Sequence, residues 1–193
     1  MGPNEQAAKK SLSKEQQIMY PYTFLTAEMY AYACGEEADK RVGRHRMSRH
    51  DTIIGICGEL VFLKYWFGDW RGYTSILGGM GQVDLNGIVE IKASATSLQG
   101  PLHLLAKEEY VEKREPEVYV QVIFDTTDGE KNTLVEGMKA AIIGWATHWD
   151  VLEAKTMNFK NKNGSYSCKA VPVKDLNPAK ELKSYLDEDI IRF

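Results

Sequence analysis

Apolar residues recur along this chain in two spacings, one typical of helices and one typical of strands. The longest apolar stretch covers residues 53–67, where apolar side chains would occupy nearly every side of a helix. A helix of that kind must be largely buried. Asp51 or Thr52 is a suitable N-cap, so we expect the helix to begin there and to end at Phe67.

Shorter patterns predict the remaining elements. Residues 118–124 and 139–146 are apolar, β-branched or aromatic, which predicts two buried strands. We also expect helices over 23–40, 102–115, 148–154 and 178–186, a short strand over 73–77, and hairpins turning at Asn86-Gly87 and near Asn163-Gly164. Helices and strands in this order predict an α/β or α+β layout around one mixed sheet.

One domain accounts for the whole chain. Its 193 residues are enough for a complete hydrophobic core, and no repeat or linker marks a second domain. We therefore expect a single domain over 1–193, with a polar and flexible segment over 1–20.

The first predicted hairpin, over 82–92, carries Asp84, Glu90 and Lys92. A two-residue loop at its Asn-Gly turn would place Asp84 and Glu90 on opposite faces. A three-residue loop over 85–87, with its glycine left-handed, would place all three charged side chains on one face. Asn-Gly suits either loop, so the residues leave the register open. We favour the three-residue loop because it separates the charged from the apolar side chains.

These three charged residues predict metal chemistry. Two carboxylates that face each other across strands repel unless a cation lies between them. Mg²⁺ or Mn²⁺ suits such oxygen ligands, and the backbone carbonyl of Ile91 is available as a further ligand. Lys92 would project beside the metal, where its ammonium can orient a water or stabilise charge on a phosphate. The group is therefore suited to hydrolysis of phosphodiester bonds.

Glu59 is an acid in the otherwise apolar helix. A buried carboxylate without a partner costs several kcal/mol, so Glu59 should have one. Gly55 and Gly58 lower the helix propensity, yet they allow another backbone or a ligand to approach. A Glu59 that faces the metal, directly or through water, would explain both features. The alternative is a helix-surface acid paired with Lys64 or an arginine.

Two motifs carry a family resemblance. Asp84, five intervening residues and then Glu90-Ile91-Lys92 resemble the D…(D/E)xK core of the PD-(D/E)xK nuclease superfamily. Residues 55–59, Gly-Ile-Cys-Gly-Glu, resemble the helical GxxGE element that often precedes that core. Val83 replaces the nominal proline of the motif, and the matched core covers residues 55–94.

The resemblance implies a restriction-endonuclease-like α/β fold, with a central mixed sheet flanked by helices, and a Mg²⁺- or Mn²⁺-dependent nuclease. In this family the two acids bind metal, the lysine assists the water and the helical acid completes the site. By residue match these roles pass to Asp84 and Glu90, to Lys92, and to Glu59. DNA is the expected substrate because most members act on it, and endonuclease action is favoured. The residues themselves do not separate DNA from RNA.

Residues 40–50 form a basic run without any acid. Its arginines, predicted to contact the phosphate backbone, are Arg41, Arg44, Arg46 and Arg49. The alternative reading is a solvated face, which is what most charge runs are. A net charge of −3 argues against a protein that coats nucleic acid non-specifically, but it is compatible with an enzyme whose positive charge is local.

Other features limit the location and the partners. No apolar run is long enough to cross a membrane. The 3 cysteines are far apart and show no metal-type pairing, which favours a reduced cytoplasmic protein. The compact size and the absence of an accessory domain suggest a stand-alone protein of a bacterium or a phage-infected cell. Two alternatives stay open, a structure-specific repair or recombination nuclease of the same fold and a catalytically silent nucleic-acid-binding module. A homodimer would favour cutting of both strands, which usually requires two sites. The presence of all three charged residues, Asp84, Glu90 and Lys92, weighs against the silent module.

Overall fold

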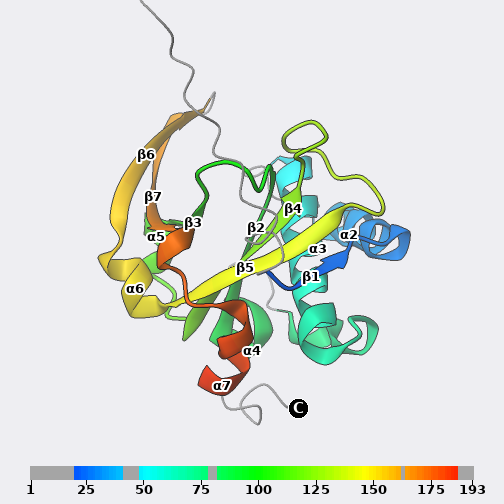
Figure 1. The fold of residues 1–193 in the computed structure, drawn as a ribbon, viewed down its shortest axis with the longest axis horizontal. Helices are drawn as coiled ribbons and strands as arrows, with labels where there is room; N and C mark the ends of the chain where they lie inside the picture. The colour runs from blue at the N-terminus through cyan, green and yellow to red at the C-terminus, as the bar shows by residue number, and fades with distance from the viewer. Residues whose placement is uncertain (1–19, 41–47, 78–81, 162–163, 187–193) are drawn as a thin grey trace, which may run out of the picture.

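The protein consists of two β-sheets with helices packed around them (Figure 1). The structure is a computed structural model, and it describes residues 20–40, 48–77, 82–161 and 164–186. In these ranges the strands are β1 (Tyr22–Phe24), β2 (Val89–Thr96), β3 (His103–Lys107), β4 (Val118–Asp125), β5 (Lys139–Thr147), β6 (Lys155–Asn161) and β7 (Gly164–Pro172). The helices are α2 (Ala27–Lys40), α3 (Arg49–Phe67), α4 (Asp84–Ile88), α5 (Glu108–Val111), α6 (His148–Glu153) and α7 (Leu182–Tyr185), with 3-10 turns η1 (Arg71–Ile76), η2 (Val173–Asp175) and η3 (Ala179–Glu181).

Sheet A is a mixed sheet with the strand order β1-β5-β4-β2. Strands β2 and β4 are parallel, whereas β4 with β5 and β1 with β5 are antiparallel. The predictions of a mixed sheet flanked by helices, and of strands over 118–124 and 139–146, are confirmed. The expectation of one sheet is wrong, because β3, β7 and β6 form a separate antiparallel sheet. Both central strands are buried along almost their whole length, which explains why their sequences are continuously apolar.

Helix α3 covers one face of sheet A. It begins after Ser48, whose hydroxyl oxygen accepts a hydrogen bond from the backbone N–H of Asp51, and it ends at Gly68 in a left-handed conformation with φ 84°. The start is therefore a few residues earlier than predicted. The predicted burial of this helix is confirmed, because its apolar residues belong to the main core.

Gly58 explains how α3 lies so close to β2. A Cβ atom added to Gly58 would lie 2.3 Å from the Cβ of Ala93, which is far inside contact distance. The predicted close approach of another backbone is thus confirmed at Gly58. The same expectation was wrong for Gly55, where an added Cβ would meet nothing within 4 Å.

Sheet B, with the order β3-β7-β6, covers part of the other face of sheet A. Its hairpin confirms the one predicted near Asn163-Gly164, since Asn161 pairs with Gly164; the turn itself lies outside the described residues. The helix predicted over 102–115 is wrong in its first half, because 103–107 is strand β3. In β3, Leu104 and Ala106 are buried and the residue between them is exposed, which is the two-residue period of a strand. Hydrogen bonds to β7, which is distant along the chain, hold this segment as a strand.

The hairpin predicted over 82–92 is also wrong. The described residues 82–88, which would form its first arm, contain no strand; residues 84–88 form a tight turn instead, and β2 pairs with β4 on its one bonded side. The strand predicted over 73–77 is replaced by η1. Helix α6 and the helical segment over 179–185 agree with the elements predicted there. None of the described helices is long and apolar enough to cross a bilayer.

Candidate active site

The turn before β2 has an unusual backbone. Leu85, Asn86 and Gly87 have φ angles of 24°, 55° and 78°, so three successive residues are left-handed. The predicted left-handed Gly87 is confirmed. Asn tolerates this region, but a leucine rarely adopts it. Leu85 is completely buried in the main core, and this anchoring holds the strained backbone in place.

The turn directs Asp84 toward the free edge of β2. The Oδ2 atom of Asp84 accepts a hydrogen bond of 2.8 Å from the backbone N–H of Ile91. The N–H and C=O of one strand residue point to the same side, so the carbonyl of Ile91 also points to this edge and away from β4. Asp84 and the Ile91 carbonyl are therefore neighbours, as predicted, although an edge turn rather than a hairpin brings them together.

Ile91 and Ala93 of β2 face Gly58 of α3. Since side chains alternate along a strand, Glu90 and Lys92 lie on the opposite face of β2. Glu90 is only 4% exposed. Its Oε1 atom accepts hydrogen bonds from Lys92 Nζ at 2.5 Å and from an Arg114 guanidinium nitrogen at 3.3 Å. Its Oε2 atom is buried and has no hydrogen-bond partner among the described residues. A buried acceptor of this kind lowers stability unless something binds it.

The pKa of Asp84 also indicates that this group of side chains would be stabilised by a cation. Burial and the negative charge of Glu90 raise the pKa of the Asp84 carboxyl to about 7, although the Ile91 N–H, Lys92 and Arg114 act to lower it. Burial, and then the charge of Glu90, also raise the pKa of the Tyr119 hydroxyl. Lys92 and Arg114 therefore do not fully offset the combined effect of burial and of the Glu90 charge on Asp84. A further positive charge at this edge would be favourable.

A divalent cation fits this donor set. The oxygens of Asp84 and Glu90, together with the Ile91 carbonyl, are hard ligands of the type that Mg²⁺ and Mn²⁺ prefer. Across the described ranges no three His, Cys, Asp or Glu side chains form a group that could hold a metal. The side-chain ligands would thus be two carboxylates, and Mg²⁺ commonly binds through one or two carboxylates while it keeps several waters.

Glu59 is not brought together with these two acids. It belongs to α3, which packs on the other face of β2, and it is partly buried. Its charge acts on Cys57, whose pKa is raised to about 12 by burial first and then by the charges of Cys34 and Glu59. Sequence spacing identified Glu59 as an acid in a buried helix but could not tell which side of β2 it would occupy.

Arg49 is also distant from the acids. Arg49 is the first residue of α3, and its Nε atom forms an ion pair of 3.3 Å with the buried Glu37 of α2. Helix α3 has 19 residues and is about 27 Å long, and its far end leads into η1, which contacts α4 beside the acids. The structure thus separates Arg49 from Asp84 and Glu90. Arg41, Arg44 and Arg46 lie outside the described residues.

Arg114 is a member of the site that the sequence did not reveal. Besides Glu90, it reaches the backbone carbonyl of Gln82 at 3.4 Å and lies 4.5 Å from the ring centre of Tyr110. The segment after β3 brings Arg114 here, and that segment was predicted as the end of a helix. No motif marks Arg114, so only the sheet topology could have located it.

Comparisons of the chain with protein-family models, with curated proteins and with solved structures find no match.

Proposed function

We propose that this protein is a metal-dependent nuclease with a restriction-endonuclease-like core, and that it hydrolyses phosphodiester bonds in nucleic acid, DNA being favoured. The observation that carries the proposal is the buried Oε2 atom of Glu90, which has no hydrogen-bond partner in the described part of the chain and lies in a group that also contains Asp84 and Lys92. Such an arrangement is unfavourable in an empty scaffold and favourable around a cation.

The residues divide the work. Asp84, Glu90 and the Ile91 carbonyl would hold Mg²⁺ or Mn²⁺, which supplies Lewis-acid stabilisation of the phosphate and a more acidic water. Lys92 is fixed by its hydrogen bond to Glu90, so its remaining N–H groups can orient a water or donate to a phosphate oxygen. Arg114 adds a second cation that can neutralise the phosphate.

Two predicted parts of the site are retained as hypotheses. The predicted role of Glu59 stays a hypothesis, although this acid belongs to the helix on the opposite face of β2, and replacement by Gln tests it separately from the two acids. Cutting of both strands would require a homodimer, and analytical ultracentrifugation of the protein with and without a DNA duplex tests whether it dimerises. Neither hypothesis is needed for hydrolysis of one strand.

The decisive experiment is a cleavage assay. Purified protein is incubated with supercoiled plasmid, linear duplex, single-stranded DNA and RNA in Mg²⁺, Mn²⁺ or EDTA. We expect metal-dependent cleavage by the wild type and none by Asp84→Ala or Lys92→Ala. Lys139→Ala is the matched control, because Lys139 lies on β5 against the ring of Tyr22 and has no contact with the acids. Cleavage of plasmid without ends establishes endonuclease action.

A second measurement separates absence of activity from absence of the site. Calorimetric titration with Mg²⁺ or Mn²⁺ should show binding to the wild type and to Lys92→Ala, but not to Asp84→Ala. No cleavage of any substrate, together with no metal binding by the wild type, would overturn the proposal and favour a silent nucleic-acid-binding module.

A further inference from the structure

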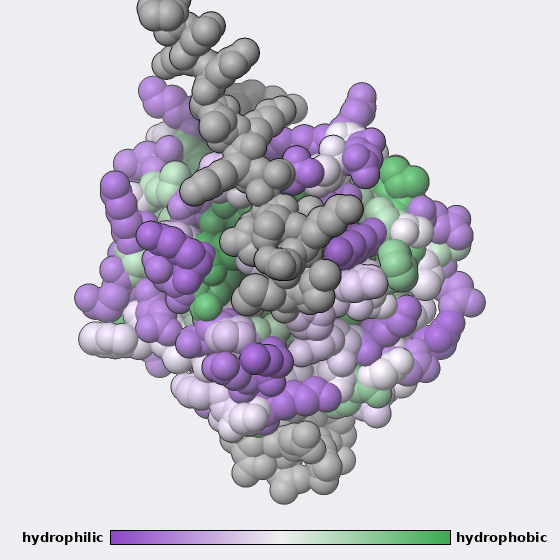
Figure 2. Space-filling model, in the orientation of Figure 1, coloured by the Kyte–Doolittle hydropathy of each residue, from purple (hydrophilic) through white to green (hydrophobic). Residues whose placement is uncertain are grey.

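The segment over 154–174 is a second basic run in a chain whose net charge is negative. It contains five lysines and no acid, in a chain whose net charge is −3. It covers all of β6 and all of β7. In Figure 2, hydrophilic residues cover much of the edge of the molecule where this hairpin lies. A charge run is usually only a solvated face, so the lysines alone identify no ligand.

Aromatic rings and cations alternate from this hairpin toward Glu90. The rings of Phe159 and Tyr166, which pair across β6 and β7, are stacked with their centres 5.4 Å apart. Lys107 Nζ lies 5.7 Å from the ring centre of Tyr166 and 5.6 Å from that of Tyr110.

The run then ends at the acids. Arg114 lies 4.5 Å from the ring centre of Tyr110 and donates to Glu90 Oε1 at 3.3 Å. Each contact joins a ring to a ring, a ring to a cation, or a cation to the candidate metal ligand. The hairpin and Glu90 are thus linked through partly buried or exposed side chains that lie outside the main core.

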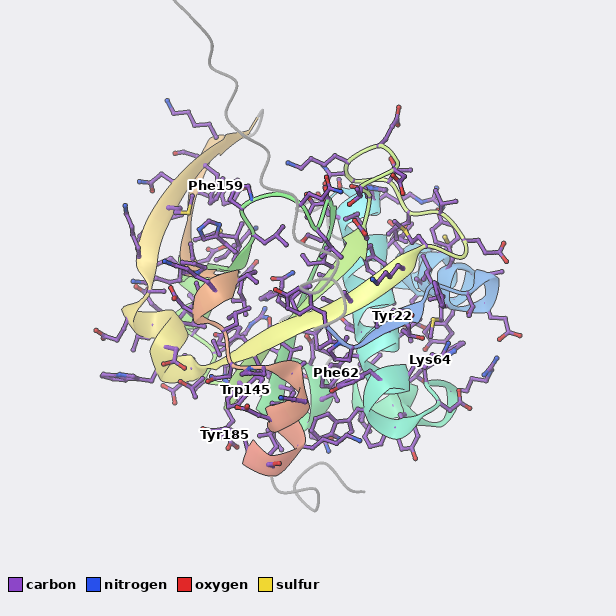
Figure 3. All side chains as sticks on the ribbon, in the orientation of Figure 1. Tyr22, Phe62, Lys64, Trp145, Phe159 and Tyr185 are labelled. Carbon is purple, nitrogen blue, oxygen red and sulfur yellow. The ribbon has the colours of Figure 1, made fainter. Side chains whose placement is uncertain are left out.

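The rings and Lys107 share one face of sheet B. Pairing of Lys107 with Cys168, and of Phe159 with Tyr166, places these residues at alternate positions on the same side. Tyr166 is 38% exposed, and Figure 3 shows Phe159 on the projecting hairpin. Burial raises the pKa of the Cys168 thiol, while the charges of Lys107 and Lys92 both lower it, so the two lysines lie within electrostatic reach of one side chain.

We propose that this face of sheet B binds a single strand of nucleic acid and leads it to Glu90. The inference rests on the proposed nuclease function and names its substrate, an unpaired strand or single-stranded end. Exposed rings can stack on unpaired bases, whereas the bases of a duplex are already stacked on each other. Lys107 and Arg114, which lie between and beside the rings, are placed to contact the phosphates. Lys155 lies on this face with Lys107, whereas Lys160 and Lys169 lie on the opposite face of the hairpin, so the positive charge offered to a strand comes from Lys107, Arg114 and Lys155.

The test is binding without cleavage. Fluorescence anisotropy in EDTA is measured with a labelled single-stranded DNA oligonucleotide and with the corresponding blunt duplex. We expect the single strand to bind at least about tenfold more tightly than the duplex. Tyr166→Ala and Phe159→Ala should each weaken single-strand binding by roughly tenfold, which is the effect of losing one stacked base.

Tyr22→Ala is the matched control. Tyr22 is 54% exposed, and Lys139 Nζ lies 4.5 Å from its ring centre, so it repeats the lysine-on-tyrosine pair on the distant strand β1 (Figure 3). Its replacement should change binding less than twofold. Ultraviolet cross-linking of bound oligonucleotide, followed by peptide mapping, gives a readout that requires no variant, and it should label the peptide that contains Tyr166.

The outcomes are distinguishable. Equal binding of single strand and duplex, or equal loss with Tyr22→Ala and Tyr166→Ala, would overturn the single-strand assignment. Cleavage by the wild type with unchanged binding by both hairpin variants would overturn this inference and leave the nuclease proposal intact. Hairpin-dependent binding, together with no cleavage and no metal binding by the wild type, would support the binding face and overturn the nuclease proposal.

Discussion

The two sides of strand β2 differ in almost every respect. On the side of α3, β2 presents Val89, Ile91 and Ala95 to the main core, and Gly58 lets the helix approach Ala93 closely. On the other side and at the free edge, the same strand presents Glu90 and Lys92 beside Asp84, and the buried Oε2 atom of Glu90 has no hydrogen-bond partner within the described ranges.

The difference separates stability from function. The α3 side is well packed, so a change there should alter folding and leave the chemistry of folded molecules unchanged. The acidic side carries burial and repulsion that lower stability, so a change there should lower activity and can raise stability. Each substitution below is chosen because it should act on one side only.

Replacement of Glu90 by Gln should have the largest effect. Gln keeps the shape but removes the charge that would hold a cation, so we expect cleavage to fall by about 10²- to 10³-fold or more. Single-turnover assays, with the concentration of folded protein measured by circular dichroism, check this. Metal titration should show the matching loss of binding.

Gly58→Ala is the comparison on the other side. Its added Cβ would lie 2.3 Å from that of Ala93, so the helix or strand must shift. We expect a loss of about 2–3 kcal/mol in the free energy of unfolding, measured with urea, and normal cleavage per folded molecule. Gly55→Ala has free space around its Cβ and should be neutral or stabilising by up to about 1 kcal/mol.

A second substitution verifies the cause. Ala93→Gly in the Gly58→Ala background removes the clashing atom and should restore part of the lost stability. If Gly58→Ala were as stable as the wild type, or if it lost activity as strongly as Glu90→Gln, the division between the two sides of β2 would be wrong.

Asp84→Asn should stabilise the metal-free protein. The folded pKa of Asp84 is raised to about 7 from an ordinary value of 3.8. Between these values the folded state holds a proton that the unfolded state has lost, so the contribution of Asp84 to stability falls as the pH rises from about 4 to about 7. Above pH 7 the full penalty remains, and Asn avoids it. We expect a gain on the order of 1–3 kcal/mol at pH 8.

Urea unfolding in EDTA at pH 5 and pH 8 measures this effect as the difference between wild type and variant. Asn can still accept the hydrogen bond from the Ile91 N–H, so the turn should persist. Addition of Mg²⁺ should then stabilise the wild type and leave the variant unchanged. A variant with the same pH dependence as the wild type would show that Asp84 is not repelled in the folded protein.

The sequence predicted the apolar side of β2 better than the polar side. The burial of α3, the strands β4 and β5, and the close approach at Gly58 follow from local composition and period. The partner of β2 does not, because a strand pairs with a residue range distant along the chain and Asn-Gly suited several turns.

The sequence predicted only those parts of the site that depend on local geometry. Asp84, Glu90, Lys92 and the Ile91 carbonyl lie within a short segment, so local geometry could group them. Glu59 and Arg114 come from other elements, and their positions depend on which face of β2 each element covers. The segment of β3 was mistaken for helix because its strand partner lies in β7, far along the chain.

The smallest effect is expected at Arg49. Arg49 lies at the end of α3 that is remote from the acids and is paired with Glu37, so Arg49→Gln should change single-strand affinity less than twofold. Lys107→Gln, on the face of sheet B, should instead lower the slope of log affinity against log salt concentration by about 1, the signature of one lost phosphate contact. Titrations at several salt concentrations compare the two variants. A larger change with Arg49→Gln than with Lys107→Gln would mean that the basic run over 40–50 contacts the nucleic acid, and that a strand reaches the acids from the α3 side of β2.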